Sequence, residues 1–406
     1  MLGFGLTDDN SAVKRSTRQR VTSAVLLSAA TLLIVVPALG VLGTAMHGVP
    51  YVGLVTAFVP WYLPWLIVAV LAGAALALLG RRRRAYTVAL IVLAVVTIVG
   101  ASVITTRMTA AVEQAGADID LIDTIGIGAR ESAPDAEAAY TTFDGEPLGL
   151  SIFQPTGASA QGRAPVLVFV HGGGWVAGDR AAHSADLRWF AEQGWLTISI
   201  DYALSTAERH LWDVTQSQIG CALAWVADNA QRYGGDPRRL SLSGDSAGGN
   251  LAINTAYLAA AGRLPSSCGG RVPAVGAVSA LYPVVDPAGF YNNDDPAFGG
   301  TARDMAGAYT GGSPQQFPQR YAAISSATYI SAAAPPTLII LGEADHLVPA
   351  AGTYRFTELA RAAGVDVGLV PVPYADHVFD GRAGSIGQQA YRQLTARWLR
   401  THGQAP

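Results

Sequence analysis

Three uncharged apolar stretches fill most of the N-terminal quarter of the chain and constrain its fold more than any other feature. They cover residues 21–43, 61–80 and 85–106, and each reaches the ~20 residues that a helix needs to cross a bilayer. The first stretch exceeds the ~7–15 apolar residues of a signal peptide and two more follow it, which disfavours a cleaved leader. We therefore expect three transmembrane helices within residues 1–107.

The distribution of basic residues predicts how these helices are oriented. Residues 1–110 carry nine Lys and Arg against two Asp, a net charge of +7, so the whole-chain charge of −3 leaves −10 for the remainder. Basic residues precede the first span and form the turn Arg81–Arg84, whereas residues 44–60 contain none. The positive-inside rule then predicts a multi-pass protein of the cell membrane, with a cytoplasmic N-terminus and everything after Arg107 extracytoplasmic. The acidic remainder argues against a nucleic-acid partner, which is the alternative explanation of the four arginines.

Regular alternation of apolar runs and longer amphipathic stretches begins after a segment rich in Ala, Asp and Gly. We expect a linker at 108–140, opening strands around 141–154, and further strands at 166–170, 196–200, 240–243, 275–282, 337–341 and 367–372. Helices are expected between them, near 182–193, 213–232, 247–262, 350–363 and 384–402. Short apolar strands separated by helices predict an α/β fold with a mostly parallel central sheet covered by helices.

One interruption of this pattern, residues 286–331, is far longer than the usual connection between two strands. It is rich in Pro, Gly, Tyr and Phe. We favour a lid-like insertion over a loop without function, within a domain spanning 141–406.

The motif GDSAG at residues 244–248 joins the expected strand 240–243 to the expected helix after it. A sharp turn from a strand into a helix exposes a hydroxyl group at a helix N-terminus, where developing negative charge is stabilised. We therefore predict that Ser246 is a nucleophile. The motif alone occurs often by chance in a chain with 45 glycines, and its position between a strand and a helix strengthens the prediction.

The motif HGGGW at residues 171–175 follows the expected strand 166–170 directly. Consecutive glycines let backbone N–H groups approach an oxyanion without interference from a Cβ atom. We predict an oxyanion hole formed by the N–H groups of Gly172, Gly173 and Ala247. A phosphate-binding turn is the alternative, but no Lys-Ser or Lys-Thr pair follows. His171 precedes the nucleophile and is expected to be structural.

Taken together, five motifs give residues 165–400 a resemblance to the hormone-sensitive-lipase-like and feruloyl or acetyl-xylan esterase branches of the α/β-hydrolase superfamily. The motifs are HGGGW (171–175), DYAL (201–204), GDSAGGN (244–250), GEADHLVP (342–349) and ADHVFD (375–380). The resemblance does not extend to the three apolar stretches.

This resemblance implies a catalytic acid at Asp345 and a catalytic base at His377, in the chain order Ser, Asp, His. Glu343, His346 and Asp376 are neighbours that we do not expect in the triad. The resemblance also implies that Asp201 and Tyr202 support the oxyanion loop. Trp175 is expected to line the substrate pocket, with a buried core tryptophan as the alternative.

The expected function is that of a serine carboxylesterase acting on short-acyl or acetyl esters, either small molecules or envelope components. Acyl transfer onto an envelope glycan, lipid or protein is one alternative, and a non-catalytic binding module is another. No cofactor or metal is expected, since neither zinc-type spacing nor a dinucleotide fingerprint occurs. The two cysteines, Cys221 and Cys268, lie in the extracytoplasmic part, where a disulfide is allowed, and the sequence leaves their pairing open.

Overall fold

The computed structural model describes residues 8–80, 84–128, 131–157 and 163–406, with backbone only for 8–16. Three of the four arginines expected in a cytoplasmic turn, residues 81–83, lie outside the described residues. The chain forms two compact units, Met1–Arg107 and Met108–Pro406.

The first unit is built from long apolar helices. They are α1 (Asp8–Ala45), α2 (Leu63–Leu79) and α3 (Arg84–Gln114), with the short 3₁₀ helices η1 (Gly53–Ala57) and η2 (Val59–Tyr62) between α1 and α2. Within the described residues, three segments are long and apolar enough to cross a membrane: Thr17–Ala45, Val59–Leu79 and Arg84–Gln114. The exposed large apolar side chains of these segments are mostly Val and Leu, which suit contact with lipid rather than water.

The second unit is organised around an eight-stranded sheet in the order β1-β2-β4-β3-β5-β6-β7-β8. The strands are β1 (Ala136–Phe143), β2 (Glu146–Phe153), β3 (Ala164–Val170), β4 (Leu196–Ile200), β5 (Gly235–Asp245), β6 (Ala277–Leu281), β7 (Thr337–Gly342) and β8 (Val367–Val372). Strand β2 is antiparallel to β1 and β4, and all other pairs are parallel. This arrangement confirms the predicted fold class.

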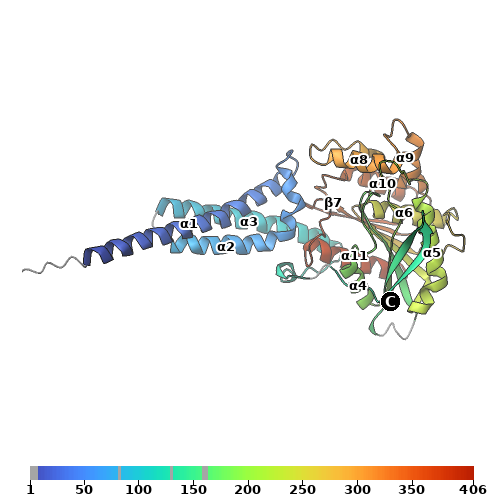
Figure 1. Cartoon of the computed structure of the whole chain (residues 1–406), viewed down its shortest axis with the longest axis horizontal. Coiled ribbons are helices and arrows are strands. Elements are labelled where there is room, and N and C mark those ends of the chain that lie inside the picture. Colours follow the sequence, from blue (N-terminus) through green and yellow to red (C-terminus); the bar gives the residue numbers. More distant parts are fainter. Residues whose placement is uncertain (1–7, 81–83, 129–130, 158–162) are drawn as a thin grey trace, which may run out of the picture. The chain divides into compact units, whose positions relative to one another are not determined.

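Helices cover both faces of this sheet (Figure 1). On one face lie α4 (Ser184–Glu192) and α11 (Ile386–Thr401), and on the other lie α5 (Thr215–Asn229), α6 (Ser246–Ala260) and α10 (Ala350–Ala362). Strand β3 is buried at every residue, as expected for a central strand with helices on both sides. The 3₁₀ helix η5 (Ala230–Tyr233) leads into β5.

The segment 286–331 contains three short helices, α7 (Pro287–Tyr291), α8 (Gly299–Thr310) and α9 (Pro318–Ile324), and the 3₁₀ helix η6 (Ser326–Tyr329). The side-chain amides of Asn250 and Asn254 on α6 both donate to the Ile324 carbonyl, so the end of this segment is attached to the helix behind the predicted nucleophile.

The predicted linker 108–140 is more ordered than expected. Helix α3 continues to Gln114, the 3₁₀ helix η3 covers Asp123–Ile125, and β1 begins at Ala136 rather than near residue 141. Residues 118–126 are hydrogen-bonded to α11 and to the turn before it. The sequence did not predict this order, because these hydrogen bonds involve backbone groups and therefore leave no apolar pattern in the sequence.

Cys221 on α5 and Cys268 in the loop after α6 form a disulfide. The bridge closes a loop with a sequence separation of 47 residues. This answers the pairing question that the sequence left open.

Candidate active site

Ser246 lies on a strained turn between β5 and α6. Its φ angle of 52° is in the left-handed region, which a residue with a side chain seldom adopts. The turn also requires close backbone approach, because a Cβ atom on Gly248 would lie 2.1 Å from the Val170 carbonyl oxygen. The motif GDSAG therefore forms the sharp strand-to-helix turn that its sequence context predicts.

The structure brings Ser246, His377 and Asp345 together from three loops at the carboxyl edge of the sheet. The Nε2 atom of His377 lies 3.0 Å from the Ser246 hydroxyl oxygen, and its Nδ1 atom lies 2.7 Å from Oδ2 of Asp345. The other oxygen of Asp345 accepts the backbone N–H groups of Leu347 and Val348. The carboxylate is thus held in one orientation, and one hydrogen-bonded chain joins all three side chains.

Two opposing effects set the pKa of His377. Burial disfavours the charged imidazolium, but the charge of Asp345 and its hydrogen bond favour it, and the net result is a pKa above the usual value. The ring is also packed against Tyr282, with centroids 4.6 Å apart.

The HGGGW loop differs from the sequence prediction at Gly172. Its N–H donates to Oδ1 of Asp245 at 2.7 Å, so this donor is already used. A Cβ atom on Gly172 would lie 2.3 Å from Oδ2 of the same carboxylate, which explains why glycine is needed there. The assignment of Gly172 to the oxyanion hole is therefore corrected, because its N–H fastens the loop to the nucleophile turn.

Gly173 and its successor Gly174 are the remaining donors of the loop. Both have positive φ angles, 106° and 61°, and neither N–H donates to a protein acceptor within the described part of the chain. The N–H of Ala247 belongs to the first turn of α6, where a helix offers no internal acceptor. The sequence does not reveal which of the three glycines holds the loop in place.

Trp175 is fully buried, so it does not line an accessible pocket in this structure. Its indole stacks on Tyr309 of α8 at a centroid distance of 4.7 Å and meets the ring of Phe290 edge-on. The alternative of a core tryptophan is the one that the packing supports. Met305 of α8 lies against the loop instead, since a Cβ atom on Gly174 would be 2.4 Å from its Sδ atom.

His171 and Tyr202 stabilise the HGGGW loop by packing and hydrogen bonding. Their rings stack at 4.3 Å, and the Tyr202 hydroxyl donates to the His171 carbonyl at 2.9 Å. Burial lowers the pKa of His171, although a hydrogen bond with the Gly172 carbonyl opposes the effect. A neutral, stacked His171 is consistent with its expected structural role.

Asp376 joins the loops that carry the acid and the base. Its Oδ1 atom accepts the backbone N–H groups of His346 and His377, and its Oδ2 atom lies 2.6 Å from Nδ1 of His346. Glu343 accepts a hydrogen bond from Tyr354. These three neighbours of the triad are thus bonded to other groups than Ser246.

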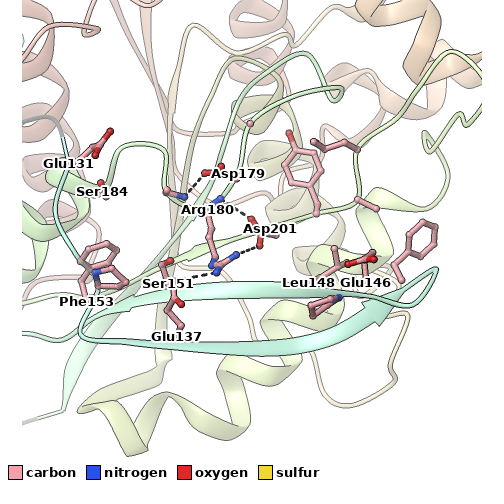
Figure 2. A pocket seen from close by; sticks show the side chains of 18 of the residues that line it. Glu131, Glu137, Glu146, Leu148, Ser151, Phe153, Asp179, Arg180, Ser184 and Asp201 are labelled. Atoms are coloured by element: carbon pink, nitrogen blue, oxygen red, sulfur yellow. Dashed lines mark hydrogen bonds and ion pairs between the residues drawn. The ribbon is translucent and has the colours of Figure 1, made fainter.

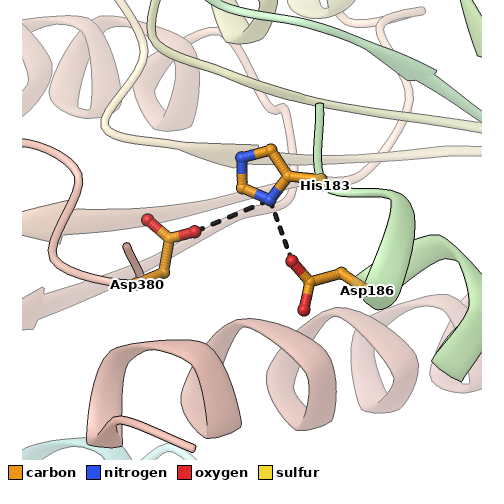
Figure 3. A group of neighbouring side chains, drawn as sticks. All are labelled: His183, Asp186 and Asp380. Carbon is orange, nitrogen blue, oxygen red and sulfur yellow. Dashed lines mark hydrogen bonds and ion pairs between the residues drawn. The ribbon is translucent and has the colours of Figure 1, made fainter. Parts of the chain in front are cut away.

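A second group of titratable side chains lies behind the nucleophile turn. Figure 3 shows His183 between Asp186 and Asp380, with Nδ1 at 3.0 Å from Asp186 and 3.6 Å from Asp380. Its Nε2 atom lies 3.9 Å from Asp245, the acceptor of the Gly172 N–H. His183 therefore connects the HGGGW loop with the segment that follows His377.

The aspartates around His183 favour its cationic form. Burial alone would lower its pKa, but the hydrogen bond to Asp186 and the charges of Asp380, Asp245 and Asp186 raise it to about 9. The ligand atoms of these three side chains are close enough to hold a metal ion, but Nδ1 of His183 lies between the two carboxylates, which is also the geometry of an ion pair. Arg392 also donates to Asp186 at 2.6 Å. The donor set therefore favours a buried ion-pair network over a metal site.

A cavity of about 930 Å³ lies at the β1–β2 side of the sheet (Figure 2). Arg180 bridges two of its walls, donating to Asp201 at 2.6 Å and to Glu137 at 3.3 Å. Asp201 also accepts the Arg180 backbone N–H, which fixes the segment after the HGGGW loop, as expected for a supporting residue. The described lining residues include none of the triad side chains.

Comparison with known proteins identifies the family. A family model described as BD-FAE matches residues 150–359, just over half of the chain. The chain belongs to the BD-FAE family. The matched segment includes Ser246 and Asp345, whereas His377 follows it.

Named relatives of this BD-FAE chain include esterases of Mycobacterium tuberculosis. Esterase LipQ is 32% identical over 221 residues, 54% of this chain and 51% of LipQ. Esterase LipC is 32% identical over 226 residues, 53% of each chain. The chain thus spans about half the length of the curated relatives it matches.

Solved structures agree with the fold. The apo form of Thermogutta terrifontis esterase 2 is 25% identical and superimposes with a TM-score of 0.55, covering 68% of this chain and 97% of the esterase. The chain therefore has an α/β-hydrolase fold after its three apolar helices.

Proposed function

We propose that this protein is a membrane-anchored serine carboxylesterase that hydrolyses short-acyl or acetyl esters through Ser246, His377 and Asp345. The observation that carries the proposal is the continuous hydrogen-bonded chain from the Ser246 hydroxyl through His377 to Asp345, on a strained strand-to-helix turn. The curated relatives named as esterases support the same reaction.

Acylation begins when Ser246 Oγ attacks the carbonyl carbon of the ester. Nε2 of His377 accepts the hydroxyl proton, and Asp345 holds the Nδ1 proton in place and stabilises the imidazolium. The carbonyl oxygen becomes an oxyanion, stabilised by the N–H groups of Gly173, Gly174 and Ala247. His377 then returns its proton to the leaving alcohol, and an acyl-enzyme remains.

Deacylation repeats these steps with water. His377 Nε2 accepts a proton from the water as it attacks the acyl carbon, and the proton then returns to Ser246 Oγ as the acyl bond breaks. The products are a carboxylic acid and the free enzyme.

The side chains packed around the HGGGW loop leave little space and therefore favour a short acyl group. Met305 lies against Gly174, and the stacked Trp175 and Tyr309 fill the space behind it. Forms of Thermogutta terrifontis esterase 2 with bound propionate and butyrate, both 26% identical to this chain, support short acyl groups. We place Met305, instead of Trp175, on the wall of the acyl site.

The catalytic unit lies outside the cytoplasm in this proposal. Three membrane-length helices and the basic residues at Arg81–Arg84 and before the first span support an odd number of crossings from a cytoplasmic N-terminus. The Cys221–Cys268 disulfide supports an oxidising compartment. An alkaline phosphatase fused after Gln114 should be active in cells, and activity of a cytoplasmic reporter at that position would contradict this orientation.

Acid release separates hydrolysis from acyl transfer. The full chain in nanodiscs should release one acid per alcohol from p-nitrophenyl propionate, with and without added envelope glycans and lipids. Ser241→Ala, a change at another buried serine of β5, is the control for folding. Ester formation that depends on the acceptor, with little free acid, would identify an acyltransferase instead.

A further inference from the structure

Exposed apolar side chains are concentrated in one loop of the second unit, residues 121–127, which we call the isoleucine loop. The exposed fractions are 45% for Leu121, 79% for Ile122, 37% for Ile125 and 97% for Ile127. These four are the majority of the seven strongly exposed large apolar side chains in the described part of residues 108–406. Such a concentration marks a surface for lipid or protein rather than for water.

The isoleucine loop is held firmly at its polar backbone. Arg382 donates to the carbonyl groups of Thr124 and Gly126, each at 2.7 Å. Before the loop, the side-chain amide of Gln389 on α11 both accepts from and donates to the backbone of Asp120. The loop therefore projects its apolar side chains outward from a fixed base.

The path of the chain identifies lipid as the occupant. Helix α3 extends seven residues beyond Arg107 to Gln114, about 10 Å along its axis. The eight residues from Gln114 to Ile122 can span at most ~28 Å, enough for the isoleucine loop to return to the headgroup region. A loop tethered this close to an apolar, membrane-length helix is within reach of the bilayer surface, and its exposed isoleucines match the apolar chemistry of lipid.

We propose that the isoleucine loop inserts into the outer face of the membrane and presents the active site to esters carried by bilayer lipids. Ile122 and Ile127 enter the boundary between headgroups and acyl chains, as the apolar face of an interfacial helix does. The carboxylates of Asp120 and Asp123 remain at the level of the headgroups. Oδ1 of Asp120 accepts the Ile122 N–H at 2.7 Å, which fixes the beginning of the loop.

Arg382, which holds the isoleucine loop, is also close in the sequence to His377, the proposed catalytic base. Arg382 follows His377 by five residues, so their Cα atoms are at most ~18 Å apart. Val378, directly after His377, is another exposed apolar residue. The substrate class, a membrane-borne acyl ester, rests on the proposed esterase activity, whereas insertion of the loop does not.

Single-site labelling tests the insertion directly in the full chain. Both native cysteines are in the disulfide, so Ile127→Cys provides one thiol for an environment-sensitive nitrobenzoxadiazole label. In phosphatidylcholine nanodiscs its emission should be blue-shifted, and lipid with a doxyl group near the acyl-chain start should quench it at least about twofold.

Arg238→Cys is the control position, since its side chain is 82% exposed near the amino end of β5, opposite the catalytic edge. The label there should be neither shifted nor quenched. Equal emission and quenching at positions 127 and 238 would overturn insertion, including the case in which a second copy of the chain covers the loop.

Two substrates separate this inference from the proposed function. The double variant Ile122→Ser/Ile127→Ser should turn over dissolved p-nitrophenyl propionate like the wild type. It should release acetate about tenfold more slowly from a vesicle-embedded diacylglycerol that carries one acetyl group and one long acyl chain. Leu359→Ser, which removes an exposed apolar side chain from α10, should leave both rates unchanged. Equal losses on both substrates would overturn a membrane-presenting role, whereas a wild type inactive on every ester would overturn the esterase proposal alone.

Discussion

The Gly172 N–H donates to Oδ1 of Asp245 at 2.7 Å, which ties the first glycine of the HGGGW loop to the residue before the nucleophile. The bond fixes the position of the loop relative to Ser246. It also leaves Gly173 and Gly174 as the N–H groups that can face a developing oxyanion.

Asp245→Ala should lower kcat about a hundredfold with little change in KM, because the oxyanion donors lose their alignment with the acyl carbon. Asp245→Asn retains an oxygen that can accept the Gly172 N–H and should lose about tenfold or less. Steady-state kinetics on p-nitrophenyl propionate measure both. Wild-type kcat in Asp245→Ala would show that this bond does not position the loop.

Asp345→Asn should change the pH dependence of the reaction as well as its rate. Asp345 raises the pKa of His377, and only the neutral imidazole accepts the Ser246 proton, so wild-type activity is lost as the pH falls through this raised pKa. Without the carboxylate the pKa falls and the acid limb of kcat/KM moves to lower pH. The same change should lower kcat about 10⁴-fold. If the acid limb of kcat/KM does not move in Asp345→Asn, a group other than His377 causes the loss of activity at low pH.

The fold was largely predictable because its strands are short apolar runs whose period and length are distinct from those of the helices. Expected strands such as 196–200 and 367–372 coincide with β4 and β8. The nucleophile turn was predictable for a similar reason, since GDSAG has a local steric cause. The order of the segment before β1 depends on hydrogen bonds to α11, more than 250 residues later, and no local pattern reports them.

The site was less predictable where the role of a residue depends on its hydrogen-bonding or packing partner in the folded protein. Gly172 and Gly174 are equivalent in the sequence, and only the position of Asp245 distinguishes them. Trp175 could line a pocket or fill a core, and Tyr309, 134 residues later, supplies the stacking partner that fills it. His183 has no motif of its own, and its importance arises from three aspartates that the fold brings together.

His183→Gln should remove a pH-dependent part of the stability. The pKa of His183 rises from 6.5 to about 9 on folding, so its contribution is complete below pH ~6.5 and is lost as the pH rises through ~9. At about 1.4 kcal/mol per pKa unit this contribution is on the order of 3 kcal/mol.

Thermal unfolding of the wild type and of His183→Gln between pH 6 and about 10 measures this pH-dependent contribution to the stability. The wild type should be the more stable protein at pH 6, and the gap should narrow as the pH rises. His402→Gln is the control, because it removes an imidazole outside this group of aspartates: its ring pairs with the exposed Asp366 and packs on Trp398. A gap that does not depend on pH would contradict a buried imidazolium.

The Cys221–Cys268 bridge should stabilise the second unit substantially. Closing a loop of 47 residues restricts the unfolded chain by ~4 kcal/mol in the chain-entropy description. Cys221→Ala/Cys268→Ala should therefore lower the free energy of unfolding by about 2–4 kcal/mol in denaturant titrations. A double variant as stable as the wild type would mean that the bridge adds nothing to the folded state.

Covalent labelling tests the central claim that Ser246 is an activated nucleophile. Forms of Thermogutta terrifontis esterase 2 phosphonylated by sarin and phosphorylated by paraoxon show this chemistry in a protein with the same fold. A fluorophosphonate probe should label the full chain at Ser246, as located by peptide mass spectrometry. Labelling and ester turnover should vanish together in Ser246→Ala and persist in Ser241→Ala. A wild-type chain that does not react with the probe, or reacts at another serine, would contradict the account.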